Sequence, residues 1–148
     1  MKKINLLLLL SAFLFACGGN SGKDESQTVK APATENTDPM KNKGIGPVTN
    51  LTLTEIDQDM VAEGKTIFEN MCTACHKADK KFIGPSPKDI LDRRTPEWVM
   101  NMILNPEEMV EKDPIAKQLL IEHNGAPMAN QNLTEDQARK VLEYFRTL

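Results

Sequence analysis

The chain has 148 residues, of which 18 are basic, 21 are acidic and 5% are aromatic. An apolar leader (residues 1–16) and a polar stretch after it (residues 17–53) leave residues 54–148 for a folded core. That size excludes multidomain architectures, and a core so poor in aromatic residues often relies on a disulfide, a metal or a cofactor. The 12 basic and 17 acidic residues of this part give a net charge of −5, which argues against nucleic acid as a partner.

The leader is typical of an export signal, because a positive end is followed by an apolar run too short to span a bilayer. Its last residues, Leu14-Phe15-Ala16-Cys17, resemble a bacterial lipobox, in which the cysteine receives a diacylglyceryl group and becomes the new N-terminus. Phe15 departs from that pattern, and ordinary signal cleavage that leaves a spare thiol is the alternative. We expect an exported lipoprotein, anchored through Cys17 on the periplasmic side of the cell envelope, in the inner or the outer membrane.

Residues 17–53 are rich in Gly, Ser, Thr, Asn, Pro and charges, and they hold few large apolar side chains. Such a composition buries too little apolar surface to compensate the entropy lost on ordering. The sequence therefore predicts a flexible tether over residues 17–53, with a root-mean-square reach of about 30 to 35 Å. The folded domain is predicted to span residues 54–148.

The decisive motif is Cys72-Thr73-Ala74-Cys75-His76. In an oxidising compartment, two thiols at this spacing followed by His match covalent haem attachment, in which each sulfur adds to a vinyl group and the imidazole reaches the iron. A thiol redox pair and a zinc site are the alternatives. A redox pair should follow a strand and open a helix, whereas this pair ends a predicted helix. Zinc needs a fourth ligand, and His123, the other imidazole of the chain, has a spacing that fits no common zinc finger. We predict one haem c bound through Cys72 and Cys75.

Helix signals dominate the rest of the domain, and no strand pattern competes with them. Thr54 is expected to cap a first helix that reaches Met71, with an apolar stripe at Ile56, Met60, Gly64 and Phe68. Thr134-Glu135-Asp136-Gln137 is a capping box that opens an amphipathic closing helix. Gly64 costs a helix interior roughly 1 kcal/mol relative to Ala, which makes sense if the closing helix crosses there. Four further helix starts pair a capping residue with proline: Ser86-Pro87, Thr95-Pro96, Asn105-Pro106 and Asp113-Pro114.

From about Thr54 to its end the chain resembles a class I c-type cytochrome, on the basis of Gly64, Phe68, the haem motif and Tyr144 in the closing helix. The resemblance implies an all-α cytochrome c fold, with a few helices around one haem and the first and last helices crossing. Gly84-Pro85 is similar to the family's Gly-Pro turn. That similarity implies that the carbonyl of Pro85 accepts a hydrogen bond from Nδ1 of His76 and orients the ring. A simple turn before Ser86 is the alternative.

The resemblance also implies a sixth iron ligand from the loop before the closing helix, where Met128 lies. Met109, His123 and an open position are the alternatives. His123 is expected to be a solvated residue at a helix C-terminus, where its positive form suits the helix dipole. The other methionines of the domain fall on predicted helices, where filling gaps in the core is their usual role: Met60, Met71, Met100 and Met102.

An imidazole and a thioether on the two faces of the iron leave no position for a substrate and favour the reduced state. We therefore expect an electron carrier rather than an enzyme, working as a monomer between respiratory donor and acceptor complexes. A haem-based sensor or peroxide-handling enzyme with a labile distal ligand is the alternative, as is a cytochrome subunit docked on a reductase or oxidase. Residues 77–94 hold six basic and three acidic residues, whereas residues 97–113 hold five acidic residues and Lys112. We hypothesise that the basic segment meets an acidic partner; the alternative is that these faces are only solvated.

Overall fold

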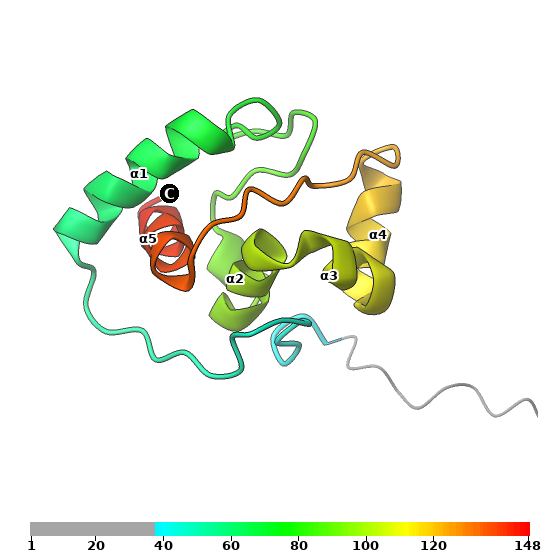
Figure 1. Ribbon diagram of the computed structural model, residues 1–148, viewed down its shortest axis with the longest axis horizontal. Coiled ribbons are helices and arrows are strands. Elements are labelled where there is room, and N and C mark those ends of the chain that lie inside the picture. Colours follow the sequence, from blue (N-terminus) through cyan, green and yellow to red (C-terminus); the bar gives the residue numbers. More distant parts are fainter. Residues whose placement is uncertain (1–37) are drawn as a thin grey trace, which may run out of the picture. The chain divides into compact units, whose positions relative to one another are not determined.

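The computed structural model describes residues 38–148, which form five α-helices and one short 3-10 helix (Figure 1). These elements are α1 (Gln58–Met71), η1 (Ile90–Asp92), α2 (Pro96–Leu104), α3 (Pro106–Lys112), α4 (Pro114–Glu122) and α5 (Glu135–Phe145). Residues 38–148 contain no strand, so the predicted all-α class is confirmed. The predicted export signal, Cys17 and the tether up to residue 37 lie outside the described residues. Within the described part, no helix has the length and apolar character needed to cross a membrane.

Three of the predicted helix starts are built by the caps that the sequence indicates. The Thr95 hydroxyl accepts the amide hydrogen of Trp98, and the Asp113 carboxylate accepts that of Ala116. Thr134 opens α5 with the predicted capping box. Proline occupies the first helical position of α2, α3 and α4, where its missing N–H leaves no donor unsatisfied.

Two predicted helix starts differ from the structure. The first helix begins at Gln58 rather than after Thr54, because the carboxylate of Asp57 accepts two amide hydrogens and becomes the cap. Ile56, which was expected on the apolar stripe, consequently precedes the helix and is 40% exposed. After Ser86-Pro87 the chain forms only the three-residue η1, because Asp89 takes a left-handed conformation (φ 52°) that ends a regular helix.

The first and last helices pack against each other (Figure 1). Gly64 lies in their contact, and a Cβ at this position would overlap the backbone carbonyl of Lys140 on α5. One turn further along α1, the ring of Phe68 lies 5.6 Å from the rings of both Tyr144 and Phe145. The predicted crossing at Gly64 is therefore confirmed, and the missing side chain is what lets the two backbones approach.

Residues 38–53, which we call the N-terminal strap, lie against α2 and α3 (Figure 1). The buried amide of Asn101 on α2 donates to the carbonyls of Lys43 and Val48, each at 2.9 Å, and accepts the amide hydrogen of Val48 at 3.0 Å. Val48 is itself only 7% exposed. The prediction that the flexible tether extends to residue 53 is wrong for the strap, because one buried polar side chain anchors a segment that has little apolar surface of its own.

A buried carboxylate joins the start of α1 to α5. Glu143 has no exposed surface, and its Oε1 accepts the amide hydrogen of Asp57 at 2.9 Å. Arg146 donates to both carboxylate oxygens at 2.7 and 2.9 Å, and Arg139 donates to Oε2. Burial by itself raises the pKa of Glu143, but the hydrogen bonds from Arg146, the Asp57 amide and Arg139 outweigh it and hold the pKa below its usual range.

Replacing this carboxylate should make stability less dependent on pH. We expect Glu143→Gln to lower the free energy of unfolding by about 3 kcal/mol at pH 7, because Arg139 and Arg146 lose their buried counter-charge. A carboxylate with a lowered folded pKa stabilises the protein above its unfolded pKa of about 4.3, and this contribution is lost as the pH falls through the folded pKa. Urea unfolding between pH 7 and pH 3 should therefore show the two proteins converging in stability. Glu69→Gln, at an exposed site on α1, is the control; a pH-independent gap at Glu143 would contradict the account.

Candidate functional site

The two cysteines lie in a tight turn at the end of α1. Cys72 is the C-cap of the helix, and its carbonyl accepts the amide hydrogens of Cys75 at 3.1 Å and His76 at 2.9 Å. Cys72 is half-buried, Cys75 is exposed, and the two do not form a disulfide. Burial raises the pKa of the Cys72 thiol to about 11, and the pair stands at the negative end of the helix dipole. A thiol redox pair needs a cysteine whose pKa is lowered, so the surroundings of Cys72 disfavour the interpretation of this motif as a redox pair.

A central crevice lies beside this turn. It consists of two hollows with about 780 and 650 Å³ of space not filled by atoms, a volume that includes space open to solvent. Cys75 opens onto the first hollow and Cys72 onto the second. The two hollows share six lining residues: His76, Pro85, Ile90, Trp98, Met102 and Met128. Apolar side chains predominate in both, as they do in sites that hold a large organic cofactor.

The ring of His76 is held in one orientation. Its Nδ1 lies 2.8 Å from the carbonyl oxygen of Pro85, and because that oxygen can only accept, Nδ1 carries the proton. In the neutral ring, Nε2 then has a free lone pair, and the ring lines the crevice. Gly84 packs on the ring so closely that a Cβ there would overlap it. The predicted hydrogen bond is confirmed, and the Gly-Pro turn supplies both the acceptor and the room for the ring.

The candidates for a second axial ligand occupy different surroundings. Met128 lines both hollows together with His76. Met109 lines neither: it is fully buried, and its sulfur accepts the amide hydrogen of Ile45 at 2.9 Å. Met109 therefore anchors the strap and is not positioned as a ligand. Met102 also lines both hollows, although the sequence assigned it only a packing role.

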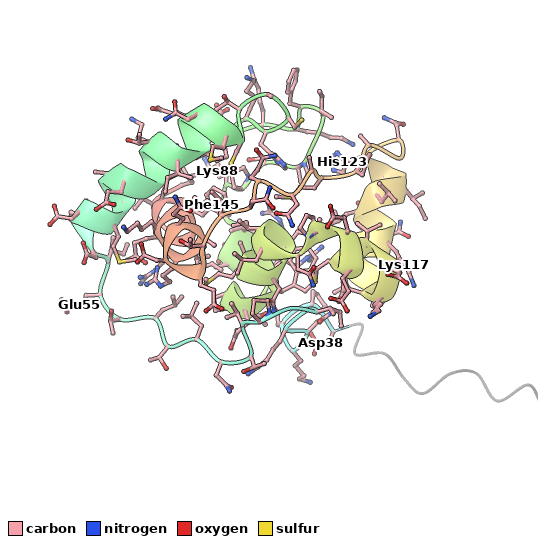
Figure 2. All side chains as sticks on the ribbon, in the orientation of Figure 1. Asp38, Glu55, Lys88, Lys117, His123 and Phe145 are labelled. Carbon is pink, nitrogen blue, oxygen red and sulfur yellow. The ribbon has the colours of Figure 1, made fainter. Side chains whose placement is uncertain are left out.

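His123 differs from its prediction. It lies just past the end of α4 (Figure 2), but it is only 8% exposed rather than solvated, and its Nδ1 lies 2.8 Å from the carbonyl oxygen of Ile83. The neighbouring Lys81 donates to the carbonyl of Glu122 at 3.2 Å, so the loop after the haem motif covers the end of α4. Ile83 and His123 are forty residues apart, so the sequence around the end of a helix cannot reveal their contact. Across residues 38–148, no three His, Cys, Asp or Glu side chains gather as a metal site, so the zinc interpretation finds no ligand set there.

The comparisons with known proteins identify the family of this small all-α fold. The family model described as Cytochrome c matches residues 61–148. The structure of cytochrome c from Rhodothermus marinus is 43% identical, covers 74% of this chain and 96% of its own, and superposes with a TM-score of 0.70. An engineered form of that protein, bound to a carbene intermediate, is also 43% identical, covers 69% of this chain and 88% of its own, and has a TM-score of 0.63. No curated protein matches the chain.

The chain therefore belongs to the cytochrome c family and has its all-α fold, with the first and last helices in contact. Haem-based electron transfer is the activity that this membership implies, and the spacing of Cys72, Cys75 and His76 is consistent with haem attachment.

Proposed function

We propose that this protein carries single electrons on one haem c, held by thioether links to Cys72 and Cys75 and by His76 and Met128 as axial ligands. The observation that carries the proposal is the crevice itself. Both cysteines open onto it, and a histidine with a free Nε2 and a methionine line both of its halves. Of the alternatives to Met128, Met109 lines neither hollow and is bonded to Ile45, whereas His123 lines the first hollow only, with its Nδ1 2.8 Å from the carbonyl oxygen of Ile83.

The residues of the chain fit the haem by their chemistry. When bound, the haem supplies a one-electron couple between ferrous and ferric iron. The carbonyl of Pro85 makes His76 a stronger donor, and the thioether of Met128 favours the ferrous state. With both axial positions filled by side chains, no substrate can reach the metal, so we propose a carrier rather than an enzyme. The apolar lining excludes water, and this keeps the rearrangement that accompanies each transfer small.

The partners proposed for this carrier are transient. Cys75, Phe82 and Ile83 are exposed beside the crevice, and the ammonium of Lys77 lies 5.0 Å from the centre of the Phe82 ring. An apolar patch with a lysine beside it, in a segment rich in basic residues, suits a weak, electrostatically guided contact with an acidic redox protein. We further propose that the protein is a monomer. On the basis of the leader sequence, we propose that it is exported and anchored to a membrane by lipid at Cys17.

Covalent attachment is tested with the full-length chain made in a bacterium able to mature c-type cytochromes. After denaturation and extraction with acidic acetone, we expect the colour to stay on the polypeptide, because a thioether bond survives both treatments. The double variant Cys72→Ser, Cys75→Ser should lose it, whereas Cys17→Ser, which removes a thiol outside the motif, should keep it. A colourless wild-type polypeptide would overturn the proposed function.

The axial ligand is tested by Met128→Ala with Met102→Ala as the matched control, since both methionines line both hollows. We expect Met128→Ala to lose the charge-transfer band of the oxidised protein, to bind carbon monoxide when reduced, and to have a lower reduction potential. Met102→Ala should keep the band and exclude carbon monoxide. Ready binding of carbon monoxide by the wild-type protein would favour the alternative of a sensor or peroxide-handling enzyme.

The docking surface is tested with ferricyanide, an anionic oxidant, acting on the reduced protein. We expect Lys80→Gln to slow oxidation at low salt more than Lys117→Gln, which removes the same charge from an exposed site on α4. The difference between the variants should vanish at high ionic strength, where a surface charge acts over only about 3 Å. Equal rates for the two variants at low salt would remove electrostatic guidance by this segment.

A further inference from the structure

His123 connects the two loops that carry the proposed axial ligands. Its Nδ1 lies 2.8 Å from the carbonyl oxygen of Ile83, and because that oxygen can only accept, Nδ1 is the donor. Ile83 lies two residues before Pro85, whose carbonyl orients the ring of His76. His123 also begins the turn after α4 that leads to Met128, five residues later (Figure 1, Figure 2). One side-chain hydrogen bond therefore joins the segment of the first ligand to the segment of the second.

Residues 83–85 are fastened to the haem motif by two further hydrogen bonds. The amide of Gly84 donates to the carbonyl of Cys75 at 2.8 Å, and the carbonyl of Pro85 accepts from Nδ1 of His76 at 2.8 Å. The third contact of the segment, from its first carbonyl, leads to the end of α4. A displacement of that end from residues 83–85 would therefore be a displacement from the haem motif itself.

The turn after α4 has a defined shape but few attachments of its own. Asn124 and Gly125 adopt left-handed backbone conformations (φ 58° and 73°), and the amide of Gly125 donates to the carbonyl of Leu120 at 2.8 Å. Within residues 121–127, His123 is buried and all the others are exposed. The buried side chain that attaches this turn to the rest of the domain is therefore His123.

A second contact joins the same two segments. The ammonium of Lys81 donates to the carbonyl of Glu122 at 3.2 Å, where a cation suits the negative end of the helix. Because Lys81 is exposed and His123 is buried, we expect the hydrogen bond of His123 to contribute more to holding the segments together.

We propose that His123 is a positioning residue of the redox centre, and that its hydrogen bond to Ile83 holds the turn after α4 so that Met128 stays bound to the iron. The inference rests on the proposed function, because it requires a haem in the crevice with His76 and Met128 as its axial ligands. The fraction of molecules in which the thioether is bound depends on how firmly the turn is held. Loss of the hydrogen bond should therefore let an outside ligand take the position of Met128 more easily.

The proposal is tested by the binding of added imidazole to the ferric form of the full-length haem protein. Imidazole displaces the thioether, so its apparent affinity measures how firmly Met128 is held. We expect His123→Leu, which is apolar and has no donor, to bind imidazole about tenfold more tightly, as the loss of one hydrogen bond implies. His123→Asn should restore the wild-type affinity, because its amide can donate from the place of Nδ1. An unchanged affinity in His123→Leu would overturn the proposal.

Asn105→Ala is the control for a merely structural effect. It removes hydrogen bonds to Ile45 and Glu108, neither of which lines the crevice. Both variants should lower the free energy of unfolding in urea, but only His123→Leu should also weaken the charge-transfer band and raise the imidazole affinity. If His123→Leu loses stability while the band and the affinity stay at their wild-type values, its role is structural and the proposal fails.

Action through Met128 is tested by combining the variants. In Met128→Ala no thioether competes with imidazole, so adding His123→Leu should not change the affinity further. Equal effects of His123→Leu in the two backgrounds would show that the substitution only opens the crevice, and the proposal would be wrong.

A measurement on the wild-type protein does not depend on the folding of any variant. If the hydrogen bond of His123 favours the bound thioether, displacement of the thioether by imidazole must weaken that hydrogen bond in return. The Nδ1 proton of His123, followed by NMR, should therefore exchange with solvent faster once imidazole is bound, and an unchanged rate would contradict the proposal. If the wild-type chain holds no covalent haem, the proposed function fails; if it does and these readouts do not move, only this inference fails.

Discussion

The close approach of α1 and α5 at Gly64 determines where the chemistry of this protein lies. Because Gly64 has no side chain, the backbone of α1 rests on the carbonyl of Lys140, and the buried Glu143 fixes the same pair at the start of α1. With both points set, the end of α1 has one position relative to α5. That end carries the cysteine turn, so the contact between two helices distant in sequence places Cys72 and His76 at the wall of the crevice.

The fold was predictable where local chemistry determines it. A capping side chain at Thr95, Asp113 or Thr134 satisfies the first amides of its helix within three residues, and such patterns are visible in the sequence. The haem motif and the Gly-Pro turn are local in the same way. Where the prediction was wrong, a long-range contact decided: Asn101 orders the strap, and the loop near Ile83 buries His123. Neither residue has a neighbour in sequence that would reveal its partner.

The residues of the candidate site also divide into those that a local sequence pattern reveals and those that only a long-range contact reveals. His76 and Met128, which line both hollows, could be singled out from the motif and from the loop before the last helix. A role for Asp113 beyond capping α4 could not be predicted, because an aspartate before a proline has an ordinary explanation as a helix cap. Only the burial of Asp113 and its hydrogen bond from Trp98 show that this carboxylate has a second task, which is to accept the indole N–H.

The hydrogen bonds of Asp113 connect the strap to a side chain that lines the crevice. A carboxylate as buried as Asp113 would be costly without donors, and it receives three, from Asn42, Trp98 and the amide of Ala116. One of these donors comes from the strap and another from a side chain that lines the crevice. Ordering of residues 38–53 therefore completes the hydrogen bonds of a carboxylate that is bonded to a side chain in the wall of the crevice. The strap and the wall of the crevice therefore share one set of buried polar contacts.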